Sequence, residues 1–66
     1  MERLRTLRRL RAMSQEELAE ESGVGRATVS RIERGETGAH GKTLRKLARA
    51  LGVDVSELVT VEGNGA

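Results

Sequence analysis

Apolar side chains recur at helical spacing along most of the chain and predict helices throughout. In the first eleven residues Leu4 and Leu7 are three positions apart, and Leu10 adds another apolar position to the same broad stripe. The sequence has no proline and few β-branched residues before position 53, so nothing interrupts a helix there. We therefore expect a first helix over residues 2–11.

A second helix is indicated by its N-terminal cap. The sequence SQEE is a capping box, in which the Ser14 hydroxyl accepts a hydrogen bond from the amide of Glu17 and the Glu17 carboxylate accepts one from the amide of Ser14. Leu18 then faces inward, and Gly23 tolerates the positive φ that closes a helix. These signals predict a helix over residues 15–22.

The third expected helix, residues 26–34, has a narrow apolar edge. Only Val29 and Ile32 are strongly apolar, at a spacing of three, and Gly35 ends the pattern. A helix that buries so thin a stripe gives most of its surface to solvent or to a partner.

A fourth helix is expected from about residue 41 or 42 to residue 51. Gly52 follows it at a position suited to a helix C-terminus. Its apolar face comprises Leu44, Leu47, Ala48 and Leu51.

A short fifth helix is expected near the end of the chain. Asp54 and Glu57 have the spacing of a second capping box, which predicts a helix through about Thr60 with Leu58 inward. Together the five segments predict an all-α domain over residues 1–61, followed by a flexible tail at 62–66.

Composition narrows the function classes. A chain of 66 residues forms one small domain at most, and without Phe, Tyr or Trp its core must be aliphatic. The absence of cysteine removes disulfides and thiolate metal sites and fits a reducing cytoplasm. His40 alone cannot form a zinc site, and no apolar run approaches the roughly 18 residues of a membrane span. We therefore expect a cytoplasmic protein that binds neither membrane nor metal.

Charge is unevenly distributed although the net charge is only +2. Residues 1–11 carry five Arg and one Glu, whereas residues 14–22 carry four Glu and no base. Bases return at 26–34 and 42–49. These runs are either solvated helix faces or a basic surface for a polyanion such as DNA.

Ala19, Gly23 and Val29 have the spacing of a helix-turn-helix. Two helices that cross steeply need a small residue at their contact, a positive-φ residue in the turn and a branched apolar residue wedged between them. Ala19, Gly23 and Val29 supply these in order, which makes 15–22 the second helix of the motif and 26–34 its recognition helix.

The stretch MSQEELAEESGVGRATVSRIERGE resembles the XRE family, the helix-turn-helix domains of the lambda repressor and Cro type. The resemblance covers about residues 3–60 and implies a five-helix lambda-repressor-like fold that places the recognition helix in the major groove of duplex DNA. It also implies a transcriptional regulator, and repression is the expected mode of action. The alternative is an antitoxin or restriction–modification controller, in which a protein partner matters as much as DNA.

The resemblance also assigns contact roles. The base-reading positions are Arg26, Ala27, Ser30 and Arg31, and the phosphate-contacting positions are Gln15, Thr28 and Arg34. Arginine can donate a bidentate pair to guanine, and an alanine methyl can lie against a thymine methyl. The alternatives are a solvated face for Arg26 and Arg31, a helix former at Ala27 and a partner of the helix dipole at Arg34.

Glu33 needs its own explanation, because an acid facing the groove would repel DNA. The resemblance implies that it turns inward and pairs with Arg8 of the first helix. The alternative is a solvent-exposed carboxylate.

The sequence GETGAHGKT is one residue short of a nucleotide-binding P-loop. A P-loop follows a strand of a parallel sheet, and this chain has no room for one. Lys42 and Thr43 nevertheless lie at a helix N-terminus, which attracts anions. The resemblance to the XRE family implies that this linker runs beside the DNA backbone, so we expect both residues to contact a DNA phosphate. No nucleophile–base pair or cofactor motif is present, so neither an enzyme nor a cofactor is expected.

A homodimer on a palindromic site is expected, because one recognition helix reads only a few base pairs. The expected contact surface consists of Val55, Leu58, Val59 and Val61, more apolar residues than we expect a short helix to bury in its own monomer.

Overall fold

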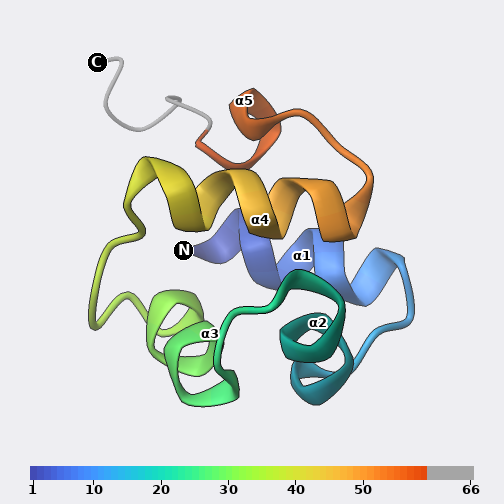
Figure 1. The fold of residues 1–66 in the computed structure, drawn as a ribbon, viewed down its shortest axis with the longest axis horizontal. Coiled ribbons are helices and arrows are strands. Elements are labelled where there is room, and N and C mark those ends of the chain that lie inside the picture. The colour runs from blue at the N-terminus through green and yellow to red at the C-terminus, as the bar shows by residue number, and fades with distance from the viewer. Residues whose placement is uncertain (60–66) are drawn as a thin grey trace.

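The computed structural model describes residues 1–59, and these form five helices and no strand. The helices are α1 (Glu2–Leu10), α2 (Gln15–Ser22), α3 (Arg26–Glu33), α4 (Gly41–Leu51) and α5 (Val55–Leu58). In Figure 1, α2 and α3 lie side by side along one edge, α4 crosses the middle, and α5 lies on the opposite edge. The predicted all-α, five-helix fold is confirmed.

The predicted capping box fixes the start of α2. The Glu17 amide donates to Ser14 Oγ at 3.0 Å, and the Ser14 amide donates to Glu17 Oε1 at 2.8 Å. Two of the amides that have no partner inside the helix are thereby satisfied.

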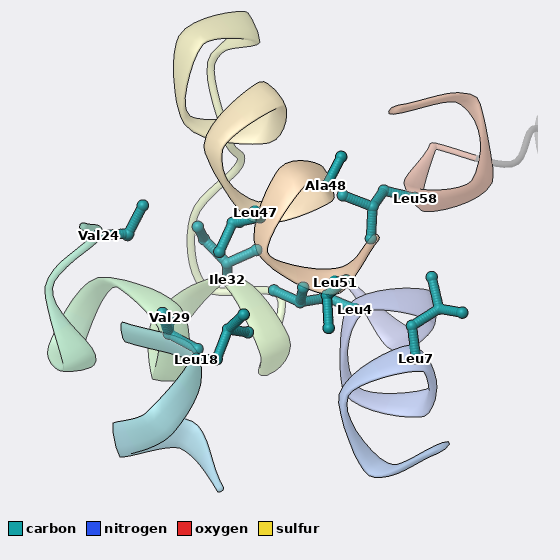
Figure 2. Packing of buried hydrophobic residues seen from close by; sticks show 10 residues of the cluster. All are labelled: Leu4, Leu7, Leu18, Val24, Val29, Ile32, Leu47, Ala48, Leu51 and Leu58. Carbon is teal, nitrogen blue, oxygen red and sulfur yellow. The ribbon is translucent and has the colours of Figure 1, made fainter. Parts of the chain in front are cut away.

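The core is aliphatic and is assembled from all five helices together with the α2–α3 turn, as Figure 2 shows. Its members are Leu4, Leu7, Leu18, Val24, Val29, Ile32, Leu47, Ala48, Leu51 and Leu58. Each fully buried Leu or Ile contributes about 1.5–3 kcal/mol relative to an exposed one. α4 carries the broadest apolar face, and it packs between α2 and α5.

Leu10 does not join this core, contrary to the expectation that it shares the stripe of Leu4 and Leu7. It is 74% exposed. Three residues turn an α-helix by about 300°, so each step of three drifts about 60° around the axis. By Leu10 the drift from Leu4 has reached about 120°, and the side chain has left the buried face.

The short helix α5 also differs from the expectation. Asp54 occupies the N-cap position, but its side chain makes no capping hydrogen bond. The Glu57 amide donates instead to the Asp54 backbone carbonyl at 2.9 Å. The helix ends at Leu58, and Thr60, Val61 and the expected tail lie outside the described residues.

Ala12 is the one non-glycine residue with positive φ, at 55°, among residues 1–59. The Ala12 amide donates to the carbonyl of Arg9 at 2.9 Å, and the Met13 amide donates to that of Arg8 at 3.1 Å. This pair of bonds is a Schellman motif, which normally has glycine at its left-handed position. Ala12 therefore holds a conformation that its Cβ disfavours.

None of the helices within residues 1–59 combines the length and apolar character needed to cross a lipid bilayer.

Candidate nucleic-acid interface

The turn between α2 and α3 has the geometry that the spacing of Ala19, Gly23 and Val29 predicts. Gly23 has φ 78°, and its amide donates to the Ala19 carbonyl at 2.9 Å. Val29 is fully buried between the two helices and the rest of the core. The turn therefore fixes α3 against α2 while its outer face stays uncovered.

An open hollow of about 320 Å³ lies on the uncovered side of this motif. It is lined by Gln15 of α2 and by Arg26, Ala27, Ser30, Arg31 and Arg34 of α3 and its C-terminal end. All four positions expected to read bases, and two of those expected to contact phosphate, are thus brought to one surface.

Arg26 and Arg31 are exposed, and their side chains make no hydrogen bond or ion pair with any described residue. A guanidinium carries five N–H donors in a rigid fork and no acceptor. The two arginines therefore present ten uncommitted donors to whatever enters the hollow, in the geometry that suits an acceptor pair such as guanine O6 and N7.

Arg34 lines the same hollow but is already paired. Its Nε donates to Glu36 Oε2 at 2.9 Å, its Nη2 donates to Glu36 Oε1 at 3.2 Å, and its Nη1 donates to Ser30 Oγ at 2.8 Å. Hydrogen bonds from the Arg34 guanidinium, with its charge, hold the pKa of Glu36 below its ordinary value. Glu36 is therefore ionised at neutral pH.

Glu33 turns away from the hollow and is buried, with its side chain 1% exposed. Arg8 Nε donates to Oε2 at 2.6 Å and Arg8 Nη2 to Oε1 at 3.0 Å, while Gln15 Nε2 donates to Oε1 at 3.0 Å. The structure therefore contains the inward Arg8–Glu33 pair that the resemblance implies, and adds Gln15 to it. This network ties α1, α2 and α3 together behind the hollow.

The environment of Glu33 keeps it charged. Burial by itself raises the pKa of this carboxyl, but the hydrogen bonds from Arg8 and Gln15 and the charges of Arg8 and Arg5 outweigh it. The net result is a pKa below the ordinary value, so the ion pair is intact at neutral pH.

Comparison with known proteins agrees with this geometry. A family model described as Helix-turn-helix matches residues 4–58. The chain belongs to the XRE-type helix-turn-helix family. No solved structure matches it significantly.

Three relatives are similar in sequence over most of this chain. Control protein C.SmaI of Serratia marcescens is 40% identical over 62 residues, 94% of this chain and 74% of that protein. The uncharacterized HTH-type transcriptional regulator RghRB of Bacillus subtilis (strain 168) is 39% identical over 96% of this chain but only 46% of its own length. The uncharacterized HTH-type transcriptional regulator y4dJ of Sinorhizobium fredii (strain NBRC 101917 / NGR234) is 44% identical over 82% of this chain and 70% of its own. The chain is a DNA-binding transcriptional regulator.

Three further residues expected to contact phosphate lie outside the hollow of this helix-turn-helix regulator. Thr28 is half-buried on α3, Lys42 is exposed in the first turn of α4, and Thr43 beside it is half-buried. The segment GETGAHGKT runs from the end of α3 into α4, so no strand precedes it within residues 1–59. A P-loop is therefore ruled out for this segment.

The apolar surface expected from α5 is smaller than the sequence indicates. Leu58 is 2% exposed because it packs into the monomer's own core, so it cannot form an intermolecular contact. Val55 is half-buried against that core, Val59 is 38% exposed, and Val61 lies outside the described residues. α5 packs against α1 and α4, so this short helix buries more apolar surface than its length suggests.

Glu36 is the residue of this site that the sequence analysis missed. The useful signal was its place directly after Gly35, because a left-handed glycine at a helix end turns the next residue back towards the last helical turn.

Proposed function

We propose that this regulator reads the base sequence of duplex DNA by placing α3 in the major groove. The observation that carries the proposal is the convergence of Gln15, Arg26, Ala27, Ser30, Arg31 and Arg34 on one open hollow. Arg26 and Arg31 donate to guanine O6 and N7, and the Ala27 methyl lies against a thymine methyl. Ser30 faces the same groove.

Phosphates on either side of the groove fix the register of α3. Gln15 combines this role with bracing, since one hydrogen of its Nε2 is committed to Glu33 and the other is free for an acceptor. Thr28 and Arg34 contact the backbone from α3 and its end, and Lys42 and Thr43 from the start of α4, where free amides favour an anion.

Two copies act together on a palindromic operator. One recognition helix reads only a few base pairs, whereas a two-fold pair reads half-sites about 34 Å apart, one turn of DNA. Val55 of α5 and Val59 directly after it are the described residues left to form the contact, at the edge of the molecule where α5 lies (Figure 1). A dimer bound across a promoter excludes polymerase, which makes repression the expected outcome.

A restriction–modification controller is a second candidate function. It is favoured by the 40% identity to control protein C.SmaI over 94% of this chain. A protein partner recovered with the chain would favour this second reading, an antitoxin or restriction–modification controller in which partner binding matters as much as DNA binding.

The experiment that tests the proposed function compares two single variants on specific and random duplexes. Arg31→Ala should weaken binding of the specific duplex by about 1–3 kcal/mol and relax the preference at one base pair. Lys42→Ala should weaken all duplexes about equally, because a phosphate contact carries no sequence information. If both variants lose the same affinity on both duplexes, the assignment of base and phosphate contacts is wrong.

A further inference from the structure

The C-terminus of α3 places Glu36 beside the arginines of the hollow. Gly35 has φ 77°, its amide donates to the Ile32 carbonyl at 3.1 Å, and the Glu36 amide donates to the Arg31 carbonyl at 2.9 Å. These two bonds form a Schellman motif. The backbone of Glu36 is thereby fixed to the last turn of α3, and its position does not depend on a loose loop.

From that position both oxygens of the Glu36 carboxylate accept hydrogen bonds from the Arg34 guanidinium, at 2.9 and 3.2 Å. Ser30 Oγ accepts a third hydrogen bond from Arg34, so three of the five N–H donors are occupied. The charge of Arg31 also acts on the same carboxylate and favours its ionised form. A negative charge is therefore held at the edge of a surface that is otherwise basic.

We propose that Glu36 is an intramolecular counterion that masks Arg34, and that it thereby weakens binding to duplex DNA and lowers the salt dependence of that binding. The inference rests on the proposed function, because it requires α3 to face a phosphate backbone. A base that neutralises a phosphate releases condensed counterions. When Arg34 leaves Glu36 to bind a phosphate, the Glu36 carboxylate is left without its counterion. This cost offsets the gain from the counterions that the DNA releases.

The Arg34–Glu36 ion pair is weak enough for DNA to break it. Both side chains are 54% exposed, and an exposed ion pair adds little to stability because water screens it. Glu36 therefore sets a threshold for DNA binding and does not block it. The hydrogen bond from Arg34 to Ser30 can persist after the carboxylate is released, which keeps the guanidinium near the hollow.

The test is Glu36→Gln, measured by titration of a random-sequence duplex at several salt concentrations. The variant should bind at least about three-fold tighter at about 50 mM salt, and the slope of log K against log salt should steepen by about 0.9, the value for one added phosphate contact. The advantage should therefore shrink about three- to four-fold between about 50 and 200 mM. Glu20→Gln is the matched control, since Glu20 is exposed on α2 and its side chain makes no hydrogen bond with a described residue.

A second background separates masking from simple repulsion of DNA by the carboxylate. In Arg34→Gln, adding Glu36→Gln should give no more than the small gain seen with Glu20→Gln. A full gain in that background, or an unchanged slope for Glu36→Gln alone, overturns the inference. Absence of salt-dependent duplex binding by the unmodified protein would instead refute the proposed function itself.

Discussion

Glu33 lies on the helix that faces DNA, yet its carboxylate points inward and accepts three hydrogen bonds from Arg8 and Gln15. Such a pair is costly to form, because both charges lose water, and more costly to break, because the remaining charge is left without a partner. No buried polar side-chain atom within residues 1–59 lacks a hydrogen-bond partner. Glu33 therefore couples the stability of the fold to the placement of α3.

Glu33→Ala should lower the free energy of unfolding by about 3–5 kcal/mol, because it leaves the Arg8 guanidinium and the Gln15 amide facing a void. A domain of this size has a total stability of about 3–10 kcal/mol, so the variant should be largely unfolded or strongly destabilised. Denaturant unfolding followed by circular dichroism measures the change. Glu36→Ala, on an exposed carboxylate, should change stability little, and equal losses in the two variants would contradict this role for Glu33.

The same pair predicts how stability depends on pH. The pKa of Glu33 is lower in the folded protein than in the unfolded chain. Its contribution is therefore fully present above the ordinary carboxyl pKa and is lost as the pH falls through the folded value. The difference in unfolding free energy between the unmodified protein and Glu33→Gln should shrink in acid. A difference that is constant from neutral to acidic pH would show that ionisation of Glu33 is not involved.

Ala12 predicts a stabilising substitution. A non-glycine residue at positive φ costs about 1–2 kcal/mol, whereas glycine adds about 0.5–1 kcal/mol of unfolded-chain entropy. Ala12→Gly should therefore raise the unfolding free energy by about 0.5–1 kcal/mol, visible as a higher denaturant midpoint. Ala27→Gly, in the helical conformation of α3, should change stability in the opposite direction. A loss of stability in both variants would show that Ala12 is not strained.

At the scale of elements, the sequence predicts the helices best where a local cap fixes them. The SQEE box starts α2 as expected, and Gly35 and Gly52 end α3 and α4 in left-handed turns. The same logic fails at Asp54, because α5 has only four residues and is held by tertiary contacts. These are the burial of Leu58 and the hydrogen bond from Arg3 Nε to the Glu57 carbonyl at 3.1 Å.

In the candidate site, too, the sequence predicts the features that depend on local structure and not those that depend on tertiary contacts. The spacing of Ala19, Gly23 and Val29 and the resemblance to the XRE family predict which face of α3 is open, since these depend on helical periodicity and one turn. The pairing of Arg34 with Glu36 and the link from Gln15 to Glu33 depend on how separate segments meet in space. No local pattern contains that information.

Val59, directly after α5, tests the proposed contact between two copies. Val59→Asp places a charge on the 38%-exposed side chain, while the buried Leu58 keeps α5 on its own monomer. Binding to a palindromic duplex should weaken and lose cooperativity, and sedimentation with the duplex should show a 1:1 complex in place of 2:1. Leu10→Asp is the control, since Leu10 is a large apolar residue that is also exposed and lies on α1. Unchanged stoichiometry in Val59→Asp would exclude α5 as the contact.

At the scale of the whole molecule, charge sidedness matters more than net charge. The net charge is only +2, yet the hollow is lined by three arginines, while four glutamates lie exposed on the outer face of α2. We expect the arginines of the hollow to favour an approach to a polyanion with α3 towards it. The rigid α2–α3 turn and the network behind it keep that orientation once contact is made.

Selection of bound sequences from a random duplex library, done with the unmodified protein and with Arg31→Ala, tests most directly whether α3 reads the base sequence. The unmodified protein should enrich one palindromic motif whose half-sites are about one helical turn apart. Arg31→Ala should enrich the same motif with the preference lost at one position in each half-site. Enrichment of no motif, or of an identical motif by both proteins, would contradict the claim that α3 reads the base sequence.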